Sequence, residues 1–361
     1  MFPLRLLLLG AVALLLSGCE TLSYYGQAIG GQLDIMSSAR PVNAWLADPG
    51  TPADLRARLQ LAERIRDFAS RSLGLPDNGS YRSYVALDRP YVVWNVFAAP
   101  RFSVEPKKEC FPLAGCVGYR GFFSEAKARA AAQKLQAEGN DVYRGGVPAY
   151  STLGWFDDPL LSTFIRYPDA QLARLIFHEL AHQLIYRPGD TTFNESFAVT
   201  VEAEGVRRWL EAEGRGAELE AFHAAQGRRK RFAERVKETR ERLAAVYKEG
   251  GSPELLEKKK QEIWAPLHAE YARVVPEQPN NAFLASVALY TELVPFFEAL
   301  LRESGGSLEA FYARVRELAK SGKRFTSPKP PGPVTSGQGD VDDLAERRAL
   351  AEPREPGLDV R

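Results

Sequence analysis

Hydrophobic residues recur every three or four positions between residues 168 and 188. At this spacing one face of a helix is apolar, and the pattern stops before a Pro-Gly pair at 188–189. After a break at 187–190, a second helix is predicted from about residue 194 to residue 210. The first helix is expected to pack on the core through Leu172, Leu175, Ile176, Leu180, Leu184 and Ile185.

The rest of the pattern predicts an α+β fold that is mainly helical. Tyr, Val and Trp are frequent in two short segments before the central helix, which is typical of strands in a small β-sheet. The segment after the second helix is charged and periodic and is interrupted once, at 250–253. The expected elements are a helix at 51–73 capped by Thr51, strands at 81–87 and 91–98, a short helix at 124–138, and a long helical hairpin at 211–274.

The chain opens with an apolar leader that ends at a cysteine. Residues 6–16 are almost all apolar, but about 20 apolar residues are needed to cross a bilayer. We therefore interpret residues 1–18 as a signal peptide. Its ending resembles that of bacterial lipoproteins, which implies that Cys19 is acylated and anchors the chain to a membrane. In such lipoproteins an aspartate after the cysteine often signals retention in the inner membrane, but this chain has Glu20 at that position. The periplasmic face of the outer membrane is therefore favoured, and the inner membrane is the alternative.

Composition narrows the classes of partner. The chain has 47 basic and 46 acidic residues and a net charge of +1. Its overall electrostatic potential therefore does not favour the binding of nucleic acid. No membrane span beyond the leader is predicted. With Cys19 acylated, only Cys110 and Cys116 remain, and an oxidising compartment makes a disulfide between them the default.

Residues 178–182 read His-Glu-Leu-Ala-His in the middle of the first predicted helix. One turn separates His178 from His182, so both imidazoles can reach one metal ion, while Glu179 projects toward a metal-bound water. Catalytic zinc usually has three protein ligands and one open position, and Glu195 in the next helix is the candidate for the third. The alternative is that both histidines are merely exposed on a surface helix. The pattern predicts one Zn²⁺ ion and metal-assisted hydrolysis, with Glu179 as the general base.

Residues 194–198, Asn-Glu-Ser-Phe-Ala, resemble the segment that carries the glutamate ligand in gluzincin aminopeptidases. Twelve residues separate His182 from Glu195, fewer than in those enzymes, so the connecting loop is shorter. Together with the leader and the first motif, residues 19–320 resemble a bacterial family of predicted aminopeptidases. This resemblance implies a zincin-like catalytic domain and a peptide substrate. A zinc endopeptidase, a cell-wall peptide amidase and a non-catalytic lipid-anchored binding protein with a vestigial metal site are the alternatives.

Five further residues are candidates for the site. Glu202 lies two turns beyond the third ligand and can accept a hydrogen bond from a ligand histidine, although it can equally be a solvated glutamate. Tyr290 is assigned by the resemblance to hydrogen-bond the oxyanion. Tyr150 is expected to line the cleft, Asp157 or the aspartate after it to hold a substrate amine, and Asn281 to contact substrate. Core packing and turn formation are the ordinary explanations for these residues.

The mature chain is expected to have three parts. A helical segment at 19–80 precedes the catalytic domain at 81–325, which includes the helical hairpin. A tail at 326–361 follows a proline-rich stretch, lacks any apolar period and is predicted to be disordered. The oligomeric state is not indicated by any pattern in the sequence.

Overall fold

The computed structural model describes residues 24, 26–111 and 115–321. The predicted leader, the predicted acylation site at Cys19 and the predicted tail lie outside the described residues. Within them the chain is mainly helical with small sheets, in agreement with the sequence.

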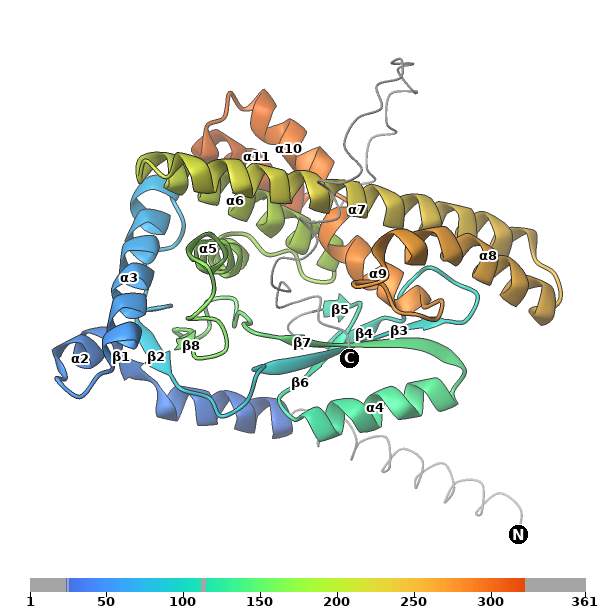
Figure 1. Ribbon diagram of the computed structural model, residues 1–361, viewed down its shortest axis with the longest axis horizontal. Coiled ribbons are helices and arrows are strands. Elements are labelled where there is room, and N and C mark those ends of the chain that lie inside the picture. The colour runs from blue at the N-terminus through green and yellow to red at the C-terminus, as the bar shows by residue number, and fades with distance from the viewer. Residues whose placement is uncertain (1–23, 25, 112–114, 322–361) are drawn as a thin grey trace, which may run out of the picture.

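Helices α5 (Asp169–Leu184) and α6 (Thr191–Ala212) pack against each other at the centre of the molecule (Figure 1). The predicted start of α6 is wrong by about one turn, because Asp190 is its cap and not only part of the preceding turn. The Asp190 side chain accepts a hydrogen bond from the Phe193 N–H at 3.1 Å, which satisfies a free donor of the first turn. Glu195 therefore lies in the second turn of α6.

A glycine allows three helices to approach closely. A Cβ atom at Gly205 of α6 would lie 2.8 Å from Cδ2 of Phe177 on α5 and 2.8 Å from Cδ1 of Leu73 at the end of α3 (Ala53–Leu73). Real Cβ atoms do not come this close to other carbons. The absence of a side chain at Gly205 thus allows α6 to pack closely against α5 and against the end of α3.

Helix α3 ends where the sequence predicts, but its predicted cap is wrong. Pro52 occupies the cap position and makes no side-chain hydrogen bond there. The Thr51 hydroxyl instead donates to the carbonyl of Trp45 at 2.6 Å, in helix α2 (Val42–Ala47). Thr51 therefore ties the two helices together rather than ending one of them.

The described strands form two three-stranded sheets and one hairpin. In the first sheet, β2 pairs antiparallel with β1 and parallel with β8; in the second, β3 pairs antiparallel with β6 and with β7. The predicted strands at 81–87 and 91–98 are present as β2 and β3. They belong to different sheets, because β3 pairs along its whole length with β7. The bounds are β1 (Arg40–Pro41), β2 (Ser83–Val85), β3 (Val93–Pro100), β6 (Arg120–Phe122), β7 (Asn140–Val147) and β8 (Leu160–Leu161).

The second sheet is covered by a helix on each face. Side chains that alternate along β3 point to opposite faces: Trp94 packs toward α4 (Glu125–Ala137), whereas Phe97 packs toward α9 (Asn281–Thr291). Ser124 caps α4, as the predicted boundary requires. Because α9 also contacts α6, it packs between the second sheet and the central helices.

A disulfide joins Cys110 and Cys116, as the sequence predicts. The two cysteines lie opposite each other in the hairpin of β4 (Glu109–Phe111) and β5 (Gly115–Val117). Gly115 has a φ of 75°, and a Cβ atom there would lie 2.5 Å from the backbone nitrogen of Gly189. The hairpin therefore rests against the connection between α5 and α6.

The predicted helical hairpin is present as α7 (Gly216–Glu249) and α8 (Pro253–Tyr271). In Figure 1, α7 crosses above α6 and continues to the right, where α8 returns beside it. Helices α10 (Val294–Glu303) and α11 (Leu308–Lys320) follow α9 and contact each other on the far side of α6 from the second sheet.

One described stretch, Asn281–Glu303, is long and apolar enough to cross a membrane by length and composition. This stretch was not predicted from the sequence as a membrane span. Half of its most apolar window is buried inside the protein, and it is divided into α9 and α10. Phe283 and Phe297 within it are fully buried, which is typical of core helices.

Candidate metal centre

Three side chains from α5 and α6 meet at one point. The Nε2 atoms of His178 and His182 lie 3.2 Å apart. Oε2 of Glu195 lies 3.3 Å from Nε2 of His178 and 3.5 Å from Nε2 of His182. The structure thus brings together the three residues that the sequence marks as candidate ligands, in a group that could hold a metal ion.

The spacing of these atoms fits a small tetrahedral metal site. Ligand atoms bound at about 2.0–2.1 Å in a tetrahedron lie about 3.3 Å from one another. The three separations, 3.2, 3.3 and 3.5 Å, match this value. Two imidazole nitrogens and one carboxylate oxygen are a donor set used by catalytic zinc sites, so the residues present fit the ion that the motif implies.

A second layer of contacts orients the first histidine. Nδ1 of His178 lies 2.8 Å from Oε2 of Glu202, which is buried and also receives a hydrogen bond from Nη1 of Arg174 at 3.3 Å. Because a carboxylate only accepts, Nδ1 carries a proton, which leaves Nε2 as the ring nitrogen that could bind a metal ion. Glu202 therefore holds the position that the sequence analysis proposed for it.

Buried charges control the protonation of the group. Burial by itself lowers the pKa of His178, but hydrogen bonds with Glu195 and Glu202 outweigh it and raise this pKa well above its ordinary value. Burial raises the pKa of Glu195, but the charge and hydrogen bonds of His182 and His178 outweigh it and lower this pKa to about 2. The centre is therefore an acid-rich pocket of negative potential in which a cation is stabilised.

Glu179 lies beside the two histidines on α5. Burial raises the pKa of its carboxyl group above the ordinary value, although the charges of His178 and His182 oppose the shift. A carboxylate with a raised pKa is a better proton acceptor near neutral pH. Glu179 is therefore a carboxylate next to the metal group with raised basicity.

Two phenols border the centre. The ring of Tyr290 stacks on the ring of His178 with centroids 6.4 Å apart and an interplanar angle of 27°. Burial and the charge of Glu195 raise the pKa of Tyr290 and that of Tyr119 well above the ordinary value, so both phenols remain protonated and able to donate. Tyr119 was not identified from the sequence, because no motif or periodicity surrounds it.

Two residues that are predicted to contact substrate have partners within the protein. The hydroxyl of Tyr150 forms a hydrogen bond with Gln32, and its ring packs edge-on against Phe123. Asn281 is fully buried at the start of α9, where its side chain donates to the carbonyl of Arg101 at 2.9 Å. The structure does not bring Asn281 to the metal group, because its polar atoms already join α9 to the loop after β3.

The two neighbouring aspartates have different surroundings. Asp157 is exposed and its carboxyl group lies against Gly79. Asp158 is only 2% exposed. Oδ2 of Asp158 accepts a hydrogen bond from the Thr152 N–H at 2.9 Å and lies 3.5 Å from Nε2 of Gln183, the residue after the second histidine. Of the two carboxylates, Asp158 is the one that faces the central helix.

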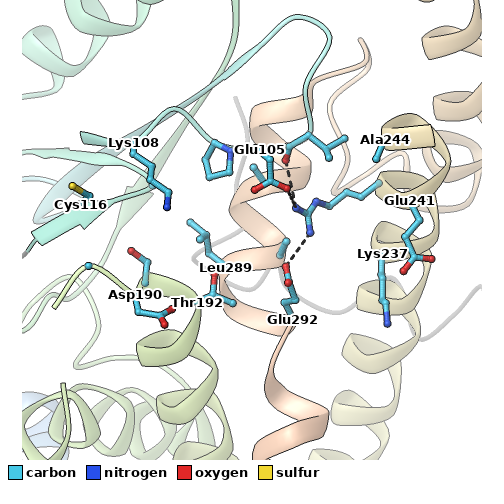
Figure 2. Close-up of a pocket in the computed structure, with 18 residues that line it drawn as sticks. Glu105, Lys108, Cys116, Asp190, Thr192, Lys237, Glu241, Ala244, Leu289 and Glu292 are labelled. Carbon is cyan, nitrogen blue, oxygen red and sulfur yellow. Dashed lines mark hydrogen bonds and ion pairs between the residues drawn. The ribbon is translucent and has the colours of Figure 1, made fainter. Parts of the chain in front are cut away.

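A cavity of about 540 Å³ lies between α7, α9 and the β4–β5 hairpin (Figure 2). Arg240 is one of the residues that line it and pairs with Glu292 at 3.2 Å. Asp190 and Thr192 at the start of α6 form part of its wall, but none of the three candidate ligands does. This cavity is therefore separate from the metal group, although both are built on α6.

The geometry defines a helical protein with a buried group that could hold a metal ion, beside a basic carboxylate and two phenols. The sequence model of the family described as "Putative aminopeptidase" matches residues 23–326. The chain belongs to this family, whose name indicates a peptidase that acts on peptides. No curated protein and no solved structure matches the chain.

Proposed function

We propose that the protein is a zinc-dependent aminopeptidase that acts in the bacterial periplasm from a lipid anchor at Cys19. The observation that carries the proposal is the tetrahedral spacing of His178, His182 and Glu195 in a chain of this family. Bound zinc would supply Lewis-acid polarisation of the scissile carbonyl and lower the pKa of water toward ~7. Three ligands suit a catalytic site, since structural zinc sites usually have four.

The proton transfers are assigned to Glu179. It accepts the proton of the attacking water and passes it to the amine that leaves. Its raised pKa supports this role, because the carboxyl group then holds the proton long enough to deliver it. A structural metal site would have no use for a carboxylate at this position.

Tyr290 and Glu202 complete the assignment. We assign to the protonated phenol of Tyr290 a hydrogen bond to the oxyanion of the tetrahedral intermediate, and the contact of its ring with His178 supports this role. Glu202 keeps His178 in the tautomer that presents Nε2. Glu202 lies on α6 with Glu195, whereas Tyr290 lies on α9, which packs against α6.

The experiment is metal analysis and hydrolysis of unblocked dipeptides by the wild type and the Glu179→Gln variant. We expect one zinc ion per chain in both proteins, and loss of turnover in Glu179→Gln to no more than a few per cent of the wild-type rate. Glu213→Gln, which changes an exposed glutamate at the end of α6, is the matched control and should retain full activity. Substantial turnover by Glu179→Gln would exclude the mechanism.

The choice between an aminopeptidase and an endopeptidase is tested with the same protein. Peptides with free and with acetylated N-termini are compared, and equal cleavage of both would exclude an aminopeptidase. The lipid anchor is tested separately, by metabolic labelling with palmitate and by fractionation of membranes. We expect label in the wild type and none in Cys19→Ser, which should leave the membrane fraction.

A further inference from the structure

Two buried oxygen atoms lie beside the central helix without a hydrogen-bond partner among the described residues. They are the hydroxyl of Tyr81 and Oδ1 of Asp158. Tyr81 is 1% exposed and Asp158 is 2% exposed. Folded proteins pair the large majority of such atoms, because a buried unpaired polar group is costly. Two such atoms, in segments that are hydrogen-bonded to each other, indicate a position that is kept for a ligand.

Both atoms are near the general base. The carboxylate of Glu179 is among the charges that raise the pKa of Tyr81 and the pKa of Asp158, after the larger effect of burial in each case. Gln183 connects Asp158 to α5, since its Nε2 lies 3.5 Å from Oδ2 of Asp158 and it follows the second histidine. The segments that carry the two oxygens therefore contact the helix that carries Glu179 and the two histidines, through Gln183.

The backbone at Tyr81 is held in a strained conformation. Its φ is 64°, which a non-glycine residue rarely adopts and which is typical of residues at functional sites. The Tyr81 N–H donates to the carbonyl of Asp158 at 2.6 Å, and the Asp158 N–H donates to Oγ of Ser80 at 3.2 Å. The segments that carry the two oxygens are thus locked to each other.

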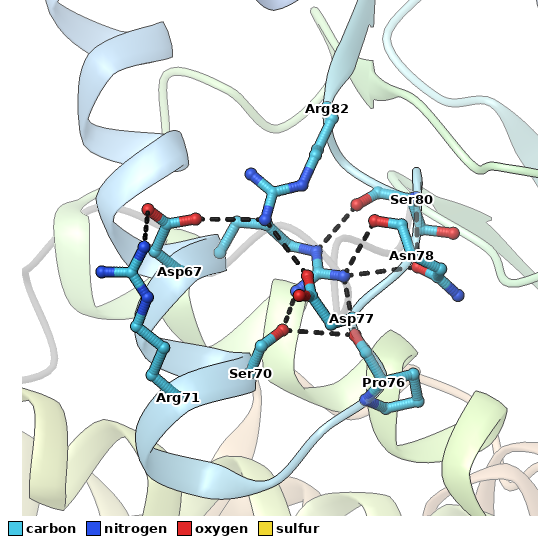
Figure 3. A network of polar contacts seen from close by, with 9 residues as sticks. Asp67, Ser70, Arg71, Pro76, Asp77, Asn78, Ser80 and Arg82 are labelled. Atoms are coloured by element: carbon cyan, nitrogen blue, oxygen red, sulfur yellow. Dashed lines mark hydrogen bonds and ion pairs between the residues drawn. The ribbon is translucent and has the colours of Figure 1, made fainter.

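A buried arginine fixes the loop before Tyr81. Nε of Arg66 donates to the Ser80 carbonyl at 2.8 Å, and Nη2 donates to the Pro76 carbonyl at 2.7 Å and to the Asn78 carbonyl at 3.2 Å (Figure 3). Arg66 is fully buried in α3. Its donors are used to shape the loop, which leaves the oxygens of Tyr81 and Asp158 as the available acceptors.

We propose that Asp158 and Tyr81 form a subsite that binds a primary ammonium group of the peptide substrate. A carboxylate oxygen and a phenol oxygen are acceptors that an ammonium with three N–H donors can satisfy together. The carboxylates of Asp157, Asp158 and Glu179 make the surroundings negative. A divalent metal ion is disfavoured there, because it needs more oxygen ligands than these two. The ammonium is the free amino terminus or a lysine side chain.

This inference rests on the proposed function, and it selects between the two neighbouring aspartates. The test compares the wild type, Asp158→Asn, Tyr81→Phe and Asp157→Asn on a free dipeptide, its acetylated form, and an acetylated peptide that contains lysine. Asp77→Asn is the control. It removes an exposed carboxylate from the same loop, and this carboxylate pairs with Arg82.

For Asp158→Asn we expect KM for the free dipeptide to rise about 10- to 100-fold with kcat and zinc content little changed, because one charge-assisted hydrogen bond is lost. For Tyr81→Phe, the rise should be about 3- to 10-fold. A rise confined to free amino termini assigns the subsite to the α-amine, and one confined to the lysine peptide assigns it to the side chain. Equal effects on all three peptides, no effect, or an effect in Asp157→Asn instead would overturn the proposal.

A binding measurement separates this inference from the proposed function. Calorimetry with leucinamide and with N-acetyl-leucinamide does not require turnover. Leucinamide should bind the zinc-loaded wild type, bind Asp158→Asn at least about 10-fold more weakly, and be preferred over its acetylated form. If no peptide is cleaved but this pattern is seen, the hydrolase assignment fails and the subsite stands; equal binding to both proteins, or none, overturns the subsite. Tyr81→Phe supplies the test if Asp158→Asn does not fold, since it removes one unpaired oxygen.

Discussion

Replacing Asp158 by asparagine removes a buried negative charge without changing the size of the side chain. Burial raises the pKa of this carboxyl group from 3.8 to about 7, with a smaller contribution from the charge of Glu179 and with opposing hydrogen bonds from Thr152. A raised pKa means that the folded state holds the proton more tightly than the unfolded state does. The stability that the proton provides is present at low pH and is lost as the pH rises through about 7.

The size of the effect follows from the two pKa values. Between pH 5 and pH 8, a shift from 3.8 to about 7 changes the free energy of unfolding by roughly 2–3 kcal/mol. Asparagine has no such dependence. As the pH is raised from 5 to 8, we therefore expect the free energy of unfolding of Asp158→Asn to rise by about 2–3 kcal/mol relative to that of the wild type. The same substitution is expected to weaken substrate binding.

The assay is urea unfolding of the metal-free proteins at the two pH values, followed by circular dichroism. Metal is removed because zinc binding to the folded state also depends on pH. Comparing the difference between variant and wild type at each pH cancels the titration of all other groups. Asp157→Asn, which removes the exposed neighbour, should show a change within about 0.5 kcal/mol. A similarly flat result for Asp158→Asn would refute the reasoning that its carboxylate is buried and poorly solvated.

Three further changes test other parts of the structure. Glu202→Gln should weaken zinc binding about 10- to 100-fold, measured by competition with a coloured chelator, because His178 loses the partner that fixes its tautomer; unchanged affinity would contradict that role. Tyr290→Phe should lower kcat about 100-fold with little change in KM in steady-state kinetics, and a change in KM alone would assign the phenol to binding instead. Gly205→Ala should lower the free energy of unfolding by about 1–3 kcal/mol in urea, since its new Cβ would lie 2.8 Å from side-chain carbons of two neighbouring helices. An alanine tolerated at no cost would mean that the helices can separate freely.

The sequence predicts the parts of the site that depend on local spacing. His178 and His182 share a helical face because they are one turn apart, and the apolar stripe around them fixes which face is buried. Glu195 was found because it follows closely in a second helix. The start of that helix was missed, since an aspartate in a turn and an aspartate at a cap look alike in sequence.

The parts of the site that depend on distant contacts could not be predicted. Nothing near Tyr119 or Tyr81 in the chain distinguishes a phenol at the centre from one in the core. Asp157 and Asp158 are adjacent and chemically identical, and only the burial of Asp158 separates them. The pairing of β3 with β7 rather than with β2 is likewise a choice between partners that local propensity does not decide.

All three candidate ligands come from one short stretch of chain, 178–195, in two helices joined by a brief loop. Contacts between residues so close in sequence lose little chain entropy and form early in folding. Asp158 joins from an earlier segment, and Tyr290 arrives only with a helix near the end of the described chain. The residues that could hold a metal ion are therefore assembled by a local part of the fold, whereas Asp158 and Tyr290 reach it only through contacts between segments that are distant in the sequence.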